Sequence, residues 1–272
     1  MTNAQVSEGT ARVQGDLWSE RATDWATVHE HNMTPVYNAA LDLLHAGPGV
    51  SVLEVGCGGG TALRLAAGRG AEVTALDAAP AFVELTRDRV PSADVRVGDL
   101  QFLPFEDESF DIVMGFNSFQ YAADASAALR EAYRVLKPGG RIAALVWGPQ
   151  EECEIASLLF ALIPFLPPPP PNAPGPFALS EPGALRALVA DAGFVVDIVA
   201  DAAGPFAYPN EEIALRGMMS AGPCVVVIRQ AGEEAVANAI LDGTAQYRRP
   251  DGSYRFENTW RFAIGRKAVD PE

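Results

Sequence analysis

A glycine-rich turn between a short apolar strand and a helix constrains the fold of this chain most strongly. Residues 51–61 read SVLEVGCGGGT, in which an apolar, β-rich run ends at Val55 and four glycines follow within five positions. Glycines let the backbone adopt dihedral angles that other residues avoid, and they let a ligand approach closely. Because an amphipathic stretch to Gly68 follows directly, the segment predicts a strand, a ligand-binding turn and a helix.

The rest of the chain repeats this strand–helix alternation. Strands are expected at residues 51–55, 72–76, 95–97, 110–115, 141–147 and 194–200, with a terminal strand at 254–265. Helices are expected at residues 60–68, 80–90, 125–136, 151–165, 180–192, 209–219 and 232–246, and two short ones within 18–44. Strands that alternate with helices indicate βαβ units and a mostly parallel sheet with right-handed crossovers.

Acidic residues follow three of the expected strands or end them. Glu54 lies two residues before Gly56, Asp77 lies 21 residues after it, and Asp99 follows the third strand. Asp77 could accept hydrogen bonds from two ribose hydroxyls or could cap the next helix, and Asp99 could bind an adenine amine or hold a turn. Open α/β sheets bind ligands at the carboxyl ends of their strands, so a nucleoside-containing ligand is predicted there.

Four segments in order resemble the class I S-adenosylmethionine-dependent methyltransferases, especially the small-molecule group that includes the ubiquinone and menaquinone biosynthesis type. They read LEVGCGGG, TALD, GDLQFLPFEDESFDIV and RVLKPGG, and they lie between residues 53 and 140. The resemblance implies a Rossmann-like, seven-stranded, mostly parallel sheet with an antiparallel last strand. It also implies a helical N-terminal cover and a lid inserted after the fifth strand.

The same resemblance implies the cofactor and the residues that hold it. S-adenosyl-L-methionine would be the methyl donor, with S-adenosyl-L-homocysteine as the product. The glycine turn would pack on the methionine part of the cofactor, and the segments after the second and third strands would hold the ribose and the adenine. The implied cofactor-binding residues are Glu54, Gly56, Cys57, Gly58, Asp77, Ala78, Asp99, Leu100 and Asn117.

The chain is expected to form one domain in four parts. These are a helical cover at 1–45, a cofactor-binding core at 46–148, a lid with the sixth strand at 149–253, and a terminal strand at 254–267. Residues 1–16 are polar and are expected to fray, and five consecutive prolines at 167–171 predict a stiff connector or lid edge.

Methyl transfer is an in-line displacement at an activated methyl group, so the protein mainly aligns the acceptor and excludes water. A hydroxyl acceptor would benefit from a general base, for which His29, His31 and Tyr121 are candidates. Surface or capping histidines and a core tyrosine are the structural alternatives. The expected substrate pocket comprises Trp25, Gln120, Tyr121 and Trp147, and no metal site is expected.

Composition narrows the partners. Acidic residues outnumber basic ones 35 to 20, giving a net charge of −15, which argues against nucleic acid and anionic membranes as partners. A polar N-terminus, three scattered cysteines and 18 arginines among the 20 basic residues suggest a cytoplasmic, bacterial protein. It would act on a small-molecule acceptor, as a monomer or homodimer.

The sequence thus predicts an S-adenosylmethionine-dependent methyltransferase of secondary metabolism with a small, apolar or aromatic acceptor. The methylated atom, whether oxygen, nitrogen or carbon, stays open. One alternative is a protein of the same fold that binds the cofactor but catalyses another step, such as a cyclisation. A second is a non-catalytic interaction module. A third is a nicotinamide-dependent oxidoreductase, which Thr61 disfavours because it replaces the third glycine of a dinucleotide-binding turn.

Overall fold

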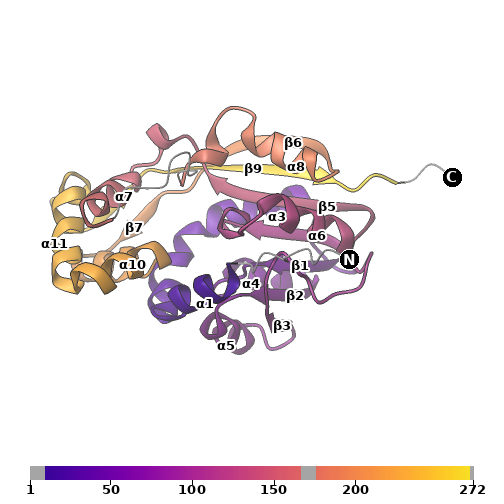
Figure 1. The fold of residues 1–272 in the computed structure, drawn as a ribbon, viewed down its shortest axis with the longest axis horizontal. Helices are drawn as coiled ribbons and strands as arrows, with labels where there is room; N and C mark the ends of the chain where they lie inside the picture. The colour runs from indigo at the N-terminus through magenta and orange to yellow at the C-terminus, as the bar shows by residue number, and fades with distance from the viewer. Residues whose placement is uncertain (1–9, 167–175, 270–272) are drawn as a thin grey trace, which may run out of the picture.

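The computed structural model describes residues 10–166 and 176–269, and it confirms the predicted fold class (Figure 1). A seven-stranded sheet has the order β3-β2-β1-β4-β5-β9-β6, in which β9 alone runs antiparallel to its neighbours. Its strands are β1 (Ser51–Val55), β2 (Glu72–Asp77), β3 (Asp94–Val97), β4 (Phe110–Phe116), β5 (Leu136–Trp147), β6 (Val195–Ala203) and β9 (Thr259–Arg266).

Helices lie on both faces of this sheet. The α-helices are α1 (Ala11–Ser19), α2 (Ala22–Asp24), α3 (Thr34–Leu44), α4 (Thr61–Gly68), α5 (Pro80–Arg89), α6 (Ala125–Val135), α7 (Ala156–Leu162), α8 (Ala184–Asp191), α9 (Glu211–Met218), α10 (Gly222–Ala231) and α11 (Glu233–Thr244). Shorter turns are η1 (Trp25–His29, a π-helix) and the 3-10 turns η2 (Glu30–Met33), η3 (Phe119–Tyr121), η4 (Gln150–Glu152), η5 (Ile163–Phe165), η6 (Ala178–Ser180) and η7 (Ala245–Tyr247).

The central strands are apolar throughout because both of their faces are covered. Neighbouring residues of β1 point to opposite sides of the sheet: Val52 joins a core with helices α3, α4 and α5, and Leu53 joins a core with α6 and α8. Both side chains are fully buried. The two cores hold the sheet between helical layers. Because β1 pairs in parallel with both β2 and β4, the carboxyl ends of these three strands lie at one edge of the sheet.

The N-terminal segment corrects one expectation. Residues 11–16 do not fray, because they begin α1, which packs against α5 and α10. A side chain at Gly15 would place its Cβ 2.3 Å from the carbonyl oxygen of Ala78, so this glycine lets α1 lie directly on the loop after β2. The polar sequence of α1 hides that contact because a glycine, rather than an apolar stripe, makes it.

The C-terminal part also differs from expectation. The predicted strand at 254–265 is two strands: β8 (Tyr254–Phe256) pairs with β7 (Phe206–Tyr208) in a separate two-stranded sheet, and β9 enters the main sheet. Asn258 lies between β8 and β9, and its side chain accepts a hydrogen bond from the Ile155 amide (3.0 Å). This bond connects the interruption between the two strands to the lid segment before α7. The predicted helix at 151–165 is divided into η4, α7 and η5.

The helices that follow β5 and do not cover the sheet lie together at one end of the molecule. Figure 1 shows α7, α10 and α11 together with β7 at the end of the molecule opposite the C-terminus, and α1 packs against α10. The proline run at 167–171 lies outside the described residues. Among the described helices, none combines the length and apolar character that a membrane span requires.

Candidate active site

A cleft at the carboxyl ends of β1, β2 and β4 encloses about 800 Å³, including space open to solvent. The loops after these strands and after β3 form one wall, and the N-terminal segments α1, η1 and η2 form the other. All nine residues predicted to bind the cofactor line this cleft: Glu54, Gly56, Cys57, Gly58, Asp77, Ala78, Asp99, Leu100 and Asn117. The fold therefore brings the predicted set together, while the part that each residue plays stays a prediction.

The glycine-rich turn crosses the sheet edge in close contact with its neighbours. The amides of Gly56 and Cys57 both donate to the carbonyl oxygen of Leu76, at 2.7 and 3.2 Å. Gly56 has φ +74°, and a Cβ there would lie 2.4 Å from the Cβ of Ser118. Only glycine satisfies both the left-handed backbone and the close approach of the loop after β4.

Asp77 braces two loops at once. Its Oδ2 accepts the Gly58 amide and its Oδ1 accepts the Ala79 amide, both at 2.8 Å. Burial raises the pKa of this carboxyl to about 6. Each carboxylate oxygen has a second acceptor site, so Asp77 can hold the loops and still accept hydrogen bonds from a ligand.

Glu54 has an unsatisfied oxygen in the cleft. Its Oε2 is buried and has no hydrogen-bond partner within the described part of the chain. Burial, followed by the charges of Glu30 and Asp77, raises the pKa of Glu54 well above its ordinary value. A buried polar atom without a partner is costly, so a polar group of a ligand would relieve that cost. Asp99 also lines the cleft while its Oδ1 accepts the Gln101 amide (2.8 Å).

The N-terminal cover supplies cleft residues that the sequence analysis missed. Glu30 is the most informative of them, because its carboxylate is buried and contacts the glycine-rich turn from 29 residues away in sequence. No local pattern in the sequence points to this contact. The missed lining residues from the cover are Thr10, Ala11, Gln14, Trp18, Glu30, Met33 and Tyr37.

A second, larger cavity of about 1470 Å³ adjoins the cleft. Trp18, Trp25, Asn117 and Tyr121 line both spaces, so they form a shared wall. None of the described residues that line the second cavity is Asp, Glu, Lys or Arg. The predicted pocket residues Trp25, Gln120, Tyr121 and Trp147 all line it. Apolar side chains from the segments after β5 line it as well, among them Ile155, Leu158, Leu159, Leu179 and Phe206.

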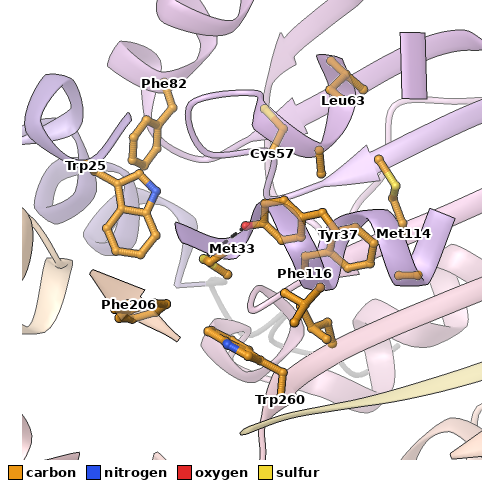
Figure 2. Close-up of a cluster of buried hydrophobic side chains, with 14 of the residues drawn as sticks. Trp25, Met33, Tyr37, Cys57, Leu63, Phe82, Met114, Phe116, Phe206 and Trp260 are labelled. Carbon is orange, nitrogen blue, oxygen red and sulfur yellow. Dashed lines mark hydrogen bonds between the residues drawn. The ribbon is translucent and has the colours of Figure 1, made fainter. Parts of the chain in front are cut away.

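Aromatic side chains from distant segments surround this region. Figure 2 shows Trp25 of η1 above Phe206 of β7, with Trp260 of β9 below and to the right of both. Trp147 stacks on Trp260, with ring centroids 4.1 Å apart, and contacts Phe206 edge-on at 5.9 Å. Trp25 lies on a π-helical turn, a rare conformation that frequently occurs at functional sites.

Asn117 adopts a left-handed backbone conformation at the shared wall. Its φ is +56°, its amide donates to the carbonyl of Leu145 (2.7 Å), and its Oδ1 accepts from the side chain of Gln120. Asparagine adopts the left-handed region more readily than most other residues, so this backbone conformation suits the residue that occupies it. The two hydrogen bonds fix Asn117 at the turn after β4, where it lines both spaces.

The three candidate bases differ in position. His29 is buried, stacks on Trp25 at 4.5 Å, and shares a hydrogen bond between its Nδ1 and the Tyr208 hydroxyl (2.8 Å). Burial lowers the pKa of His29 to about 3, so the ring is neutral but weakly basic. Tyr121 lines both spaces, and burial raises its pKa to about 12. His31 is exposed and lines neither space.

Comparison with known proteins agrees with this geometry. A family described as "Methyltransferase domain" matches residues 53–144. Malonyl-[acyl-carrier protein] O-methyltransferase of Serratia marcescens is 40% identical over 95 residues, covering 35% of this chain and 37% of that protein. The chain spans only 31% to 45% of the length of curated relatives such as this one.

Solved structures support the fold. The YcgJ protein of Bacillus subtilis aligns with 88% of this chain and 99% of its own, with a TM-score of 0.57 and 18% identity. The [4+2]-cyclase SpnF aligns with 96% of this chain and 94% of its own, with a TM-score of 0.58 and 18% identity. Residues 53–144 thus resemble a methyltransferase domain, and the chain shares the fold of these solved structures.

Proposed function

We propose that this protein binds S-adenosylmethionine in the cleft and transfers its methyl group to a small, uncharged, apolar or aromatic acceptor in the second cavity. The observation that carries the proposal is the wall shared by the two spaces. Trp18, Trp25, Asn117 and Tyr121 border both the acidic cleft and the uncharged cavity. A methyl group presented at this wall would face an acceptor directly.

The charge of the cleft supports this cofactor over a dinucleotide. Glu30, Glu54, Asp77 and Asp99 line the cleft, and no Lys or Arg is among its described lining residues. S-adenosylmethionine supplies a methyl group activated by a positively charged sulfonium. A nearby cation favours the ionised form of these carboxyl groups, against the burial that raises the pKa values of Glu30, Glu54 and Asp77, whereas the negative pyrophosphate of a nicotinamide cofactor would be repelled by any that are ionised. The aromatic faces of Trp18 and Trp25 at the wall also attract cations.

The second cavity supports an apolar acceptor. Its described lining carries no charged side chain, so a charged molecule would lose its hydration without gaining a partner. The low pKa of His29 and the high pKa of Tyr121 make both groups weak bases or acids near neutral pH. We therefore propose that the protein acts mainly by aligning the acceptor and excluding water, with His29, His31 and Tyr121 as candidate bases to be tested.

The wider setting is also a proposal. We propose a cytoplasmic, bacterial enzyme of secondary metabolism that acts as a monomer or homodimer, without nucleic acid or membrane as a partner. The net charge of −15 and the arginine-rich basic content support this setting. Cys57, Cys153 and Cys224 are free thiols in the structure, which suits a reducing compartment.

Calorimetric titration with S-adenosylmethionine, S-adenosylhomocysteine and NADH tests the cofactor. We expect micromolar binding of both sulfur compounds, no binding of NADH, and about 30-fold weaker binding to Asp77→Asn, which keeps the side-chain shape but loses an acceptor. Asp94→Asn is the matched control, because Asp94 is an exposed carboxylate at the opposite end of the neighbouring strand β3. Absence of binding by both sulfur compounds would refute the proposal.

Methyl transfer itself requires a second assay. Incubation with methyl-labelled S-adenosylmethionine and a panel of neutral phenols, amines and polyketide-like acceptors should label at least one acceptor. Binding of the cofactor without labelling of any neutral or charged acceptor would instead favour the alternative of a non-methylating step such as cyclisation.

A further inference from the structure

Glu30 joins the N-terminal cover to the glycine-rich turn. It is the first residue of η2 and is 3% exposed. Its Oε1 accepts the Gly59 amide (3.1 Å) and its Oε2 accepts the Thr61 hydroxyl (2.8 Å). We propose that Glu30 is a positioning residue that holds the glycine-rich turn in its cofactor-binding shape and makes that shape depend on docking of the cover. This inference rests on the proposed function of the cleft.

Arg89 of α5 completes the contact from the other side. Its Nη1 donates to the carbonyl oxygen of Gly59 (2.8 Å), and its Nη2 donates to the carbonyl oxygen of Ala26 (3.0 Å) in η1. Arg89 Nη1 also lies 3.8 Å from Glu30 Oε2. The Gly59 amide and carbonyl are thus both held, one by the cover and one by a side chain that also holds the cover.

The glycines of the turn make room for this contact as well as for a ligand. A Cβ on Gly59 would lie 2.6 Å from Glu30 Oε2 and 2.5 Å from the Cβ of Ala26. A Cβ on Gly58 would lie 3.0 Å from Glu30 Oε1. Gly58, which is predicted to bind the cofactor, and its neighbour Gly59 therefore both lie close to the N-terminal cover.

The position of Glu30 affects the cleft directly. Trp25 and Met33, which lie before and after Glu30 in the chain, line the same cleft, and Glu30 itself does so too. If Glu30 lost its hold on Gly59 and Thr61, the turn and this part of the wall could separate. Cofactor affinity should then fall although no contact made by Asp77 has been removed.

The charged surroundings make this contact sensitive to pH. Glu30 faces Arg89 from α5, Glu54 from β1, the Tyr37 hydroxyl from α3 and the Cys57 thiol of the turn. Burial raises the pKa of Glu30 to about 7. The ionised carboxylate accepts both hydrogen bonds, whereas the protonated form has one oxygen that is a donor.

Asp77, a second carboxylate close to Glu54 and Cys57, titrates in a similar pH range. Asp77 acts on Glu54 and on Cys57 through its charge, and its own pKa is about 6. A pH profile of the wild type therefore contains contributions from several groups. The contribution of Glu30 is the part that disappears in Glu30→Gln.

The test is calorimetric titration of S-adenosylhomocysteine into the full chain at pH 6, 7 and 8. The variants are Glu30→Ala, Glu30→Gln and, as a control, Glu84→Ala, since Glu84 is exposed on α5. We expect binding to be weakened about 30-fold in Glu30→Ala and about fivefold in Glu30→Gln at pH 8, with no change in the control. The wild-type affinity should rise from pH 6 to pH 8 more steeply than that of Glu30→Gln.

The outcomes separate this inference from the proposed function. If the wild type binds and a folded Glu30→Ala binds within twofold of it, the inference is wrong and the proposed function stands. If Glu30→Ala does not fold, Glu30→Gln decides: wild-type affinity with the wild-type pH profile overturns the inference. If the wild type does not bind, the proposed function fails and the inference fails with it.

Discussion

The cleft and the second cavity share a wall but are built in opposite ways. The cleft takes its predicted residues from the ends of four strands and the loops after them, between Glu54 and Asn117, and each of these segments has a local sequence pattern. The second cavity takes its residues from the segment after β4 and from scattered elements that include α1, η1, β5, α7, β7 and α10, so its lining extends from Trp18 to Cys224 in the chain. Under the proposed function, the cleft would hold the cofactor and the cavity would determine which acceptor is methylated.

The largest effect should come from filling the glycine-rich turn. Gly56→Ala would put a Cβ 2.4 Å from Ser118 at φ +74°, so the turn must move. We expect binding of S-adenosylhomocysteine to weaken by a factor of about 100 or more, and unfolding to become easier by roughly 2–4 kcal/mol. Calorimetry and urea denaturation measure both effects.

Gly68→Ala is the control for that variant. Gly68 ends α4, and a Cβ there meets nothing within 4 Å. Alanine should leave binding unchanged and stabilise the helix slightly, by up to about 1 kcal/mol. Equal binding by Gly56→Ala and Gly68→Ala would contradict the view that the turn is shaped for a ligand.

The next effect is the pH dependence of stability that comes from Glu30, which joins the N-terminal cover to the core. Burial raises the pKa of Glu30 to about 7, above the ordinary value of 4.5, so the native state favours the protonated form. The stability from this group is present below pH 4.5 and is lost as the pH rises through 7, a change of roughly 3 kcal/mol. Urea denaturation from pH 4.5 to pH 8 should show a smaller decline for Glu30→Gln than for the wild type.

The exposed Glu84 again supplies the control, as Glu84→Gln. Its pH profile should match that of the wild type. Parallel profiles for the wild type and Glu30→Gln would mean that Glu30 titrates as an ordinary carboxyl, which contradicts its burial between the cover and the turn.

A smaller effect should separate the acceptor cavity from the cleft. Trp147 lines the cavity but not the cleft, and it stacks on Trp260. Trp147→Leu should lower turnover with an active acceptor about tenfold while cofactor affinity changes less than twofold, because the side chain and its stacking on Trp260 belong to the cavity and not to the cleft. Phe160→Leu is the control, since Phe160 is a half-exposed aromatic residue of α7 that lines neither space. A parallel loss of cofactor affinity in Trp147→Leu would contradict the division into two sites.

The smallest effects are expected from two helix caps, which test whether the lid and the core unfold together, as the prediction of one domain requires. Asp124 caps α6 in the core by accepting a hydrogen bond from the Ala127 amide. Asn210 caps α9, which lies in the lid at 149–253, by accepting one from the Ile213 amide, and both distances are 2.9 Å. Replacing either cap with alanine should cost about 1 kcal/mol in a single transition. Two separate transitions in Asn210→Ala, followed by tryptophan fluorescence and circular dichroism, would divide the chain into two units.

The sequence could predict the core because its structure depends on local patterns. The alternation of strands and helices, the turn at Gly56 and the acids after β2 and β3 all have short-range signatures, and the predicted residues lie together in the cleft. The missed elements lack such signatures. Residues 222–231 contain the run Val225-Val226-Val227-Ile228, which has no helical periodicity, and yet they form α10.

Long-range contacts explain the other differences. The Glu30 contact with Gly59 crosses 29 residues, and α1 is ordered through the contact between Gly15 and Ala78. Both His29 and His31 lie in the N-terminal cover, but His29 is buried in the π-helical turn η1 and His31 is exposed in the following turn η2. Sequence spacing alone does not distinguish these two positions.

A crystal structure of the protein with S-adenosylhomocysteine would show whether the two spaces serve the cofactor and the acceptor. We expect the ligand in the cleft, with its ribose at Asp77 and its sulfur facing the wall formed by Trp18, Trp25, Asn117 and Tyr121. The second cavity should remain open to an acceptor. A ligand bound elsewhere, or with its sulfur turned away from that wall, would contradict the account.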